Sequence, residues 1–325
     1  TEQLVIDKSL SLIGPNAGLS AGVTPEARGS EAVIKYPTGL IDYQEMIWID
    51  AEDVTIDGFT LDGQDLDGSY DSAGIVSEEK NLTIKNNIIK NFNYIGILTT
   101  SYEYVSGSWD RTYYNTGLLI EDNLVTNEIS DRYYNYSAIY VQGDNGIVRG
   151  NVADKAYRGM QIQPYGNPET TQGLVENNHV KGYRTGIWFN YSEVDAVNWL
   201  IKDNLVEGIA YPSSETPDRW DGLLVQTFYG GSVAFTGNTV NFGTTDATAV
   251  YPFGIIYWPT TSTGTVDLDA TFANNTFERA VVITDGTNII KTQPDMAFYS
   301  MIQDAIDAAS DGNTIEVGPG TYGEA

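Results

Sequence analysis

Four aspartates are the residues of this chain whose type and setting best suit catalysis: Asp110, Asp131, Asp218 and Asp221. We expect them in loops that converge on one groove, where two facing carboxylates could cleave a glycosidic bond. An arginine directly follows three of them, at positions 111, 132 and 219, so surface ion pairs explain the same residues. The sequence therefore leaves open whether the protein is an enzyme.

A second group of carboxylates lies in residues 56–74, where Asp62, Asp65 and Asp67 follow one another at short spacing. Clustered carboxylate oxygens suit Ca²⁺, a hard cation. The segment is not an EF-hand loop, because it lacks the glutamate that such a loop needs at its twelfth position. Asp-Gly turns explain much of the same composition. Calcium is therefore the one cofactor that the sequence suggests, and none is required.

Aromatic and amide side chains recur at strand positions that alternation predicts to face outward. Tyr and Trp rings stack on the apolar faces of sugars, and amides bond sugar hydroxyls, so we predict a groove that binds a polysaccharide or cell-surface glycan. Its residues are Tyr140, Gln142, Gln161, Gln163, Trp188, Asn190, Gln226 and Trp258. The alternative is that the loops fold back over these strands and the aromatic side chains form a secondary core.

These residues belong to an internal repeat. In each unit an apolar pair leads into Asn and two further apolar positions, and this Asn falls at 87, 123, 151, 178, 204, 238 and 275. A shortest period in the high twenties, lengthened in some units by loops, is what a three-stranded coil requires. Asn tolerates the left-handed conformation of a tight turn, and stacked amides can bond from coil to coil. We therefore assign these asparagines a structural role.

A second short strand follows in each unit. Its alternation predicts one inward column, formed by Ile97, Ile139, Met160, Ile187, Leu223, Ile255 and Val281. Stacking the coils would bury this column as a continuous apolar core.

The whole pattern resembles the right-handed parallel β-helix repeat proteins of the pectate-lyase-like superfamily. The resemblance implies an all-β solenoid of about ten coils. It does not assign an activity, because the superfamily includes lyases, hydrolases, epimerases and adhesins. The Gly-His-Gly of its polygalacturonase-like members is missing here, and the single histidine, His179, directly follows an Asn turn, where a structural role is the default. Lyases of polyuronates usually need a basic residue in the groove, and no lysine lies in the outward rows.

Residues 296–325 differ from the repeat. An apolar stripe predicts one short helix near the C-terminus, with Phe298, Ile302, Ala305, Ile306 and Ala309 on one side. The helix and the strand after it resemble the cap and first strand of a following β-helix unit, so we divide the chain into a β-helix, 1–295, and this segment, 296–325. The chain is then either one unit of a tandem array or a molecule whose last strand docks on the first coil of another.

The composition narrows the function. A net charge of −27 with a pI near 4.1 argues against nucleic acid and, more weakly, against polyanionic glycans. No apolar run reaches the length of a membrane span, and the chain has no cysteine. We therefore expect an extracellular or cell-surface structural or adhesive module that binds glycans. The alternative is a glycoside hydrolase or lyase that uses groove carboxylates.

Overall fold

The computed structural model describes most of the repeat region. It describes residues 3–36, 44–64, 72–100, 103–105, 108–110, 116–127, 134–164, 172–189, 198–210, 219–226, 232–241, 251–258, 265–266, 268–277, 281–284 and 289–293. Closer to the C-terminus it describes Gln303, Ile306, Asp307, Ala309 and Ile315.

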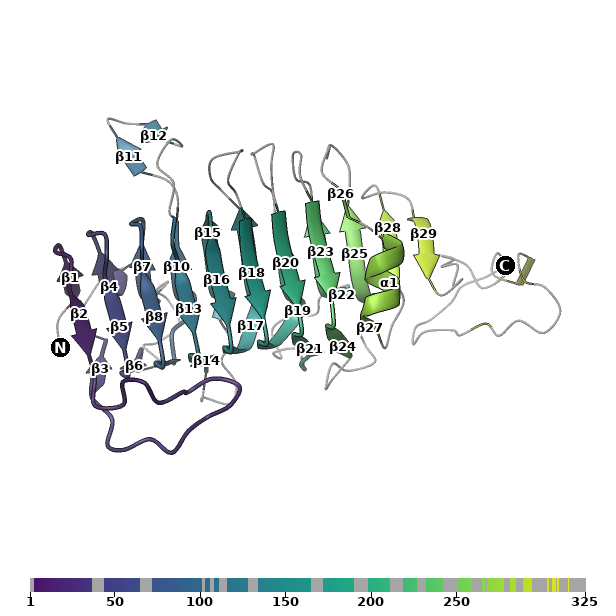
Figure 1. Ribbon diagram of the computed structural model, residues 1–325. Helices are drawn as coiled ribbons and strands as arrows, with labels where there is room; N and C mark the ends of the chain where they lie inside the picture. The colour runs from purple at the N-terminus through teal and green to yellow at the C-terminus, as the bar shows by residue number, and fades with distance from the viewer. Residues whose placement is uncertain are drawn as a thin grey trace.

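The chain winds into a parallel β-helix whose coils stack along one axis (Figure 1). Among the described residues, each of the first nine coils contributes a strand to each of three faces and the tenth contributes a strand to face 1, and each strand pairs in parallel with the equivalent strands of the neighbouring coils. Face 1 carries the longest strands. They are β1 (Leu4–Ile6), β4 (Gln44–Ile49), β7 (Ser72–Ser77), β10 (Ile95–Thr99), β15 (Tyr134–Gly143), the ends of β17 (Val152–Pro164) and β19 (His179–Phe189), β22 (Arg219–Gln226), β25 (Tyr251–Trp258) and β28 (Val281–Thr284).

The other two faces are made of shorter strands. Face 2 is a 9-stranded sheet of β2 (Ser11–Ile13), β5 (Thr55–Asp57), β8 (Thr83–Lys85), β13 (Leu119–Glu121), β16 (Gly146–Arg149), β18 (Gln172–Glu176), β20 (Asn198–Lys202), β23 (Ser232–Thr236) and β26 (Thr265–Val266). Face 3 contains β3 (Val33–Lys35), β6 (Thr60–Asp62), β9 (Ile88–Lys90), β14 (Leu124–Thr126), the starts of β17 and β19, β21 (Leu205–Gly208), β24 (Thr239–Asn241) and β27 (Thr276–Phe277). The ten strands of face 1 confirm the predicted solenoid of about ten coils.

The core is built of stacked columns, one or two from each face. The inward column predicted for face 1 is confirmed, because Ile97, Ile139 and Met160 are Cα partners in consecutive coils and each is 0% exposed. Its later members continue the same register. Face 2 contributes an equivalent column that includes Ile84 and Ile120, both fully buried. Each coil thereby buries apolar surface against its two neighbours, which is the main stabilising term of a solenoid.

The repeated asparagines form a ladder at the turn between faces 2 and 3. In the Asn ladder, from Asn123 onward, the Oδ1 of each residue accepts hydrogen bonds from the backbone N–H and the Nδ2 of the Asn one coil earlier. For Asn151 both bonds are donated by Asn123, at 3.0 Å. The Nδ2 of each ladder Asn also donates to a backbone carbonyl of the preceding coil, as Asn151 does to Ile120 at 2.9 Å. The predicted structural role is therefore confirmed.

The left-handed conformation at this turn belongs to a different residue from the one predicted. It is taken by the residue just before each ladder position from Asn87 to Asn238, and by Gly58 before Phe59 in the preceding coil, with φ between 53° and 83°. We call these residues the turn row: Gly58, Asn86, Asp122, Gly150, Asn177, Asp203 and Gly237. Asn, Asp and Gly are the residues that adopt this conformation at least cost.

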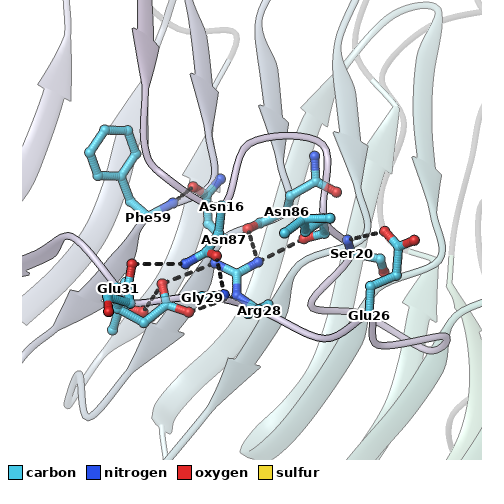
Figure 2. Close-up of polar contacts among 12 residues, drawn as sticks. Asn16, Ser20, Glu26, Arg28, Gly29, Glu31, Phe59, Asn86 and Asn87 are labelled. Carbon is cyan, nitrogen blue, oxygen red and sulfur yellow. Dashed lines mark hydrogen bonds and ion pairs between the residues drawn. The ribbon is translucent and has the colours of Figure 1, made fainter.

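One long connection crosses the turn row. Residues 14–32, which we call the strap, join β2 to β3 and lie over the same turn of the following coils (Figure 1). The strap therefore begins at the turn of the first coil and covers the turns of the coils after it. Arg28 pins it, because its guanidinium pairs with Glu31 at 2.8 Å and donates to the carbonyl of Asn86 at 2.7 Å (Figure 2).

The C-terminal part departs from the predicted pattern in two ways. Before the ladder residue Asn275, where the repeat predicts an apolar pair in a strand, the chain forms α1 (Leu268–Asn274), a helix on β23, and only the strand after it, β27, follows the repeat. The last strand, β29 (Ile289–Gln293), pairs antiparallel with β28. Of the predicted C-terminal helix, Gln303, Ile306 and Asp307 are helical, and the rest lies outside the described residues, as does most of 296–325.

Candidate functional site

The outward column of face 1 has the register that the sequence predicts. Leu98, Tyr140, Gln161 and Trp188 are Cα partners in successive coils, and the column continues to Leu224 and Ile256. The burial differs from the expectation of an exposed amide surface. Gln161 is 1% exposed, whereas Tyr140 and Trp188 are half-buried. In this column a ligand can therefore contact the rings of Tyr140 and Trp188 but not the amide of Gln161.

Two further predicted amides form a network with Tyr140. The Tyr140 hydroxyl donates to Gln163 Oε1 and accepts from Gln142 Nε2 at 2.6 Å, and Gln142 Nε2 also donates to Gln163 Oε1 at 2.9 Å. Gln142 and Gln163 are 5% and 7% exposed. Because these bonds join two coils, the network fixes the orientation of the Tyr140 ring.

Arg158 is the centre of a continuous group of rings on the same face. Its guanidinium carbon lies 4.1 Å from the ring centre of Trp188 and 4.4 Å from that of Tyr136. Tyr136 in turn stacks on Tyr94, with ring centres 5.3 Å apart. Arginine is suited to such a position because its planar cation is attracted to aromatic faces and is weakly hydrated. We call Tyr94, Tyr136, Tyr140, Tyr157, Arg158, Arg184 and Trp188 the aromatic strip.

The strip extends sideways through Tyr157. Its ring lies 5.2 Å from the Arg158 guanidinium and 5.3 Å from that of Arg184, and it meets Tyr183 edge-on. Both arginines are therefore partners of aromatic rings. One signal in the sequence could have located the strip: Arg158 and Arg184 each lie shortly before the inward residue of a face 1 strand, Met160 and Ile187, in adjacent coils.

One polar atom of the strip has no partner. The indole Nε1 of Trp188 is buried and donates to no acceptor within the part of the chain that the structure describes. A buried N–H without an acceptor carries a free-energy cost of about 1–3 kcal/mol. A water or a ligand hydroxyl that accepted from it would remove that cost.

The N-terminal and central coils match a known protein family. A family model described as a protein of unknown function, DUF1565, matches residues 5–198, more than half of the chain. The chain belongs to the DUF1565 family. No curated protein and no solved structure matches it. The matched residues of this DUF1565 chain include the strap, the turn row as far as Asn177 and every residue of the aromatic strip.

The remaining predicted glycan contacts lie at the edge of the described structure. Gln226 is half-buried and is the Cα partner of Trp258 on β25. The side chain of Trp258 and the whole of Asn190 lie outside the described residues. Their part in glycan binding stays a prediction.

Of the four candidate catalytic aspartates of the DUF1565 chain, the structure describes Asp110 and Asp221, so the convergence of the four on one groove stays a prediction. Asp221 was expected in a loop but lies in β22 and is 0% exposed. Asp110 was also expected in a loop but ends β12 (Ser108–Asp110), which forms an antiparallel hairpin with β11 (Glu103–Val105). Asp131 and Asp218 lie outside the described residues. A fully buried Asp221 cannot contact a substrate without a rearrangement of face 1.

The acidic segment predicted to bind calcium is described only in part. Asp62 Oδ1 accepts from the backbone N–H of Gln64 at 3.0 Å and from Asn91 Nδ2 at 2.9 Å, so it shapes a turn. Asp65 and Asp67 lie outside the described residues. Across the residues that are described, no three His, Asp or Glu side chains converge as metal ligands. Calcium binding stays a prediction.

His179 lies at the opposite corner of the coil from the aromatic strip. Its Nε2 contacts Glu207 Oε2, one coil further on, as expected for a histidine with a structural role. It also lines a hollow of about 470 Å³ beside the strap, together with Asp122, Arg149 and Asp203. Among the described residues of this family member, no helix is both long enough and apolar enough to cross a membrane.

Proposed function

We propose that the protein is an extracellular or cell-surface adhesive β-helix module that binds glycans through the aromatic strip. The observation that carries the proposal is the contact of the Arg158 guanidinium with Trp188 and Tyr136, at 4.1 and 4.4 Å. These contacts hold three flat groups in one continuous surface, on which the apolar face of a sugar ring can stack.

The electrostatics favour a neutral glycan. The net charge of −27 repels polyanionic chains over a long range, whereas Arg158 and Arg184 act locally. The right-handed winding and the membership of the pectate-lyase-like superfamily, with its many carbohydrate-active members, are part of the same proposal.

The proposal is tested by binding and turnover together. A glycan array of neutral and charged oligosaccharides identifies a binder, and isothermal titration measures its Kd. We expect Trp188→Ala to weaken that Kd at least about tenfold, because a ring in a carbohydrate site contributes over 1 kcal/mol. Arg158→Lys keeps the charge and loses the flat contact, so a loss of about three- to tenfold is expected.

The matched control is Trp48→Ala. Trp48 lies in β4, occupies the same outward column through its partner Val76, and is half-buried, but it lies coils away from Arg158. Its variant should bind as the native protein does. If the array gives no binder, or if all three variants bind alike, the glycan proposal is wrong. Reducing sugar released from a bound glycan would favour the hydrolase or lyase alternative.

We also propose that the module assembles through the ends of its solenoid, with a second copy or a tandem neighbour on the first coil. The supporting observation is the first coil itself, whose strands pair on one side only within the described residues. Exposed sheet edges of this kind favour pairing with another chain.

A further inference from the structure

The strap shows how an extended segment binds to the turn row. The carbonyls of three consecutive turn-row residues accept hydrogen bonds from it: Asn86 from Arg28 Nη1 at 2.7 Å, Asp122 from the N–H of Ala21 at 3.0 Å, and Gly150 from the N–H of Val23 at 2.8 Å. The donors are therefore two peptide N–H groups and one guanidinium. Each coil provides one acceptor, and the strap runs from coil to coil across them.

Close approach of the two backbones is part of this binding. A Cβ built on Gly22 would lie 1.9 Å from the carbonyl oxygen of Gly150. Only glycine fits at this contact, since no real Cβ lies so near an oxygen. The strap therefore touches the turn row along its main chain, and the side chains of Arg28 and Ser20 add contacts with Asn86 and Asp122.

The turn row continues beyond the point where the strap turns back. Asn177 and Asp203 have φ of 53° and 54°, close to the 54° of Asp122. No described residue donates to their carbonyl oxygens or to that of Gly237. All three residues are exposed, whereas Asn86 beneath the strap is 5% exposed. The same row of acceptors is thus occupied in the first coils and open in the later ones.

A hollow of about 470 Å³ lies at the junction between the covered and open parts. Val23 and Thr24 of the strap form one wall, and Asn177, Asp203 and Leu205 form part of the opposite one. Val23 is 43% exposed, so the wall offers an apolar contact as well as the carbonyls.

The charge around the hollow is negative. Three carboxylates line it, those of Glu121, Asp122 and Asp203, against one guanidinium, that of Arg149, and Arg149 is already paired with Glu121. The ligand that complements carbonyl acceptors and unbalanced carboxylates carries N–H donors and positive charge. The strap's own Arg28 is an example of that chemistry on the same row.

We propose that the open part of the turn row, from Asn177 through Asp203, is a docking track for an extended cationic peptide of a partner protein. The peptide continues the line of the strap, donates main-chain N–H groups to the turn carbonyls, and places an arginine or lysine beside Asp203. Small residues in the peptide allow the backbone approach that Gly22 makes in the strap.

The test uses a fluorescein-labelled nonapeptide, Arg-Ala-Gly-Val-Arg-Ala-Gly-Val-Arg, which combines the strap's Ala-Gly-Val with arginines. Fluorescence anisotropy with the whole chain should give saturable binding at peptide concentrations below about 1 mM. Asp203→Asn should weaken it about fivefold or more, because this change removes one charge in the track. Asn adopts the same left-handed backbone, as Asn177 does one coil earlier, so the fold is kept.

The matched control is Asp53→Asn. Asp53 is also exposed, also has a positive φ, of 58°, and lies at another corner of the coil. Its variant should bind the peptide as the native chain does. Equal weakening by both variants would mean general attraction to an acidic protein and would overturn the proposal. So would a failure to saturate, or equal binding of the peptide with Glu in place of each Arg.

A second readout locates the peptide. With a diazirine-bearing residue in place of the first valine of the peptide, cross-links should map by mass spectrometry to residues 22–24, 177–179 and 203–205, three segments that line the hollow. Cross-links confined to the aromatic strip or to the first coil would place the peptide elsewhere and would refute the docking track.

Discussion

At the scale of single residues, the Asn ladder shows how a buried polar group stabilises a solenoid. Asn151 is 0% exposed, and its Nδ2 donates to Ile120 in the coil before it and to Asn178 in the coil after it. Its Oδ1 accepts twice from Asn123. A buried amide with all its partners adds to stability, while the loss of one partner leaves several groups unsatisfied.

The substitution Asn151→Ala should therefore cost more than an ordinary core truncation. It removes the acceptor of two Asn123 donors and the donor to Ile120, and each buried unsatisfied group costs about 1–3 kcal/mol. We expect a total loss of about 3–5 kcal/mol, measured by urea unfolding followed by circular dichroism.

The control for this substitution is Asn198→Ala. Asn198 is exposed in β20, and its described side-chain contact is a hydrogen bond from Ser232. A change there should stay within about 0.5 kcal/mol. If the two variants lose the same stability, the ladder amides contribute no more than surface ones.

The ladder also marks how far single residues could be predicted. Its members followed from spacing alone, because a stacked amide must recur once per coil. The left-handed residue was misplaced by one position, although Asn86, Asp122 and Gly150 are of the types that this conformation favours. The contacts of Arg158 could not be predicted from the sequence, since they join residues of three coils whose strands, β15, β17 and β19, pair with register shifts.

At the scale of elements, the strap is an ordered connection held by a few charged contacts. Arg28 binds Glu31 through two nitrogens, at 2.8 and 3.1 Å, and Glu31 also accepts from Thr60 on β6 (Figure 2). The hydrogen bond from Arg28, followed by that from Thr60, lowers the pKa of Glu31 below its usual 4.5 against the opposing effect of burial. A lowered pKa in the folded state means that ionised Glu31 stabilises the bound strap.

Acid should therefore loosen the strap. The contribution of Glu31 is complete above pH 4.5 and is lost as the pH falls through its lower folded pKa. The chain has no cysteine, so Thr24→Cys at the exposed strap tip can be labelled alone. We expect the anisotropy of the label to fall below about pH 4.5 while circular dichroism of the solenoid is unchanged.

Two variants test whether Glu31 is the group responsible for that loosening. Glu31→Gln should give low anisotropy already at pH 7, while Glu52→Gln, which removes an exposed partner of Lys80, should behave as the parent. Asp122 acts in the opposite sense, because burial raises its pKa and its contribution is lost as the pH rises through that value. A transition that persists unchanged in Glu31→Gln would assign the acid effect to another group.

The elements also show where sequence periodicity stops being informative. The strands of all three faces followed from alternating apolar residues, which recur in register for coil after coil. At 268–274 the same short apolar phrase forms α1, because a run of four to eight residues fits a helix as well as a strand. The position of Asn275 and the strand that follows it, β27, were predicted correctly.

At the scale of the whole molecule, the two ends of the described solenoid differ. At the far end, β29 pairs antiparallel with β28 and covers the edge of face 1. At the first coil, β1, β2 and β3 each have one described partner strand, and Val5, Leu10, Ile13 and Val33 are 57%, 40%, 55% and 47% exposed. The first coil thus combines unpaired edges with the largest group of exposed apolar side chains in the described structure.

End-to-end association through the first coil is the prediction that belongs to this scale. The mass from light scattering should rise with concentration from about 10 to 500 µM as the edges pair. Val33→Lys should abolish that rise, since a lysine on an edge strand prevents pairing. Thr239→Lys is the matched control. Thr239 is exposed in the same column of face 3 as Val33, but it lies seven coils along, away from the edge. The Thr239→Lys variant should still associate. A native chain that stays monomeric at every protein and salt concentration would show that the open edge alone does not drive assembly. If Val33→Lys and Thr239→Lys reduce association equally, another surface is responsible for it.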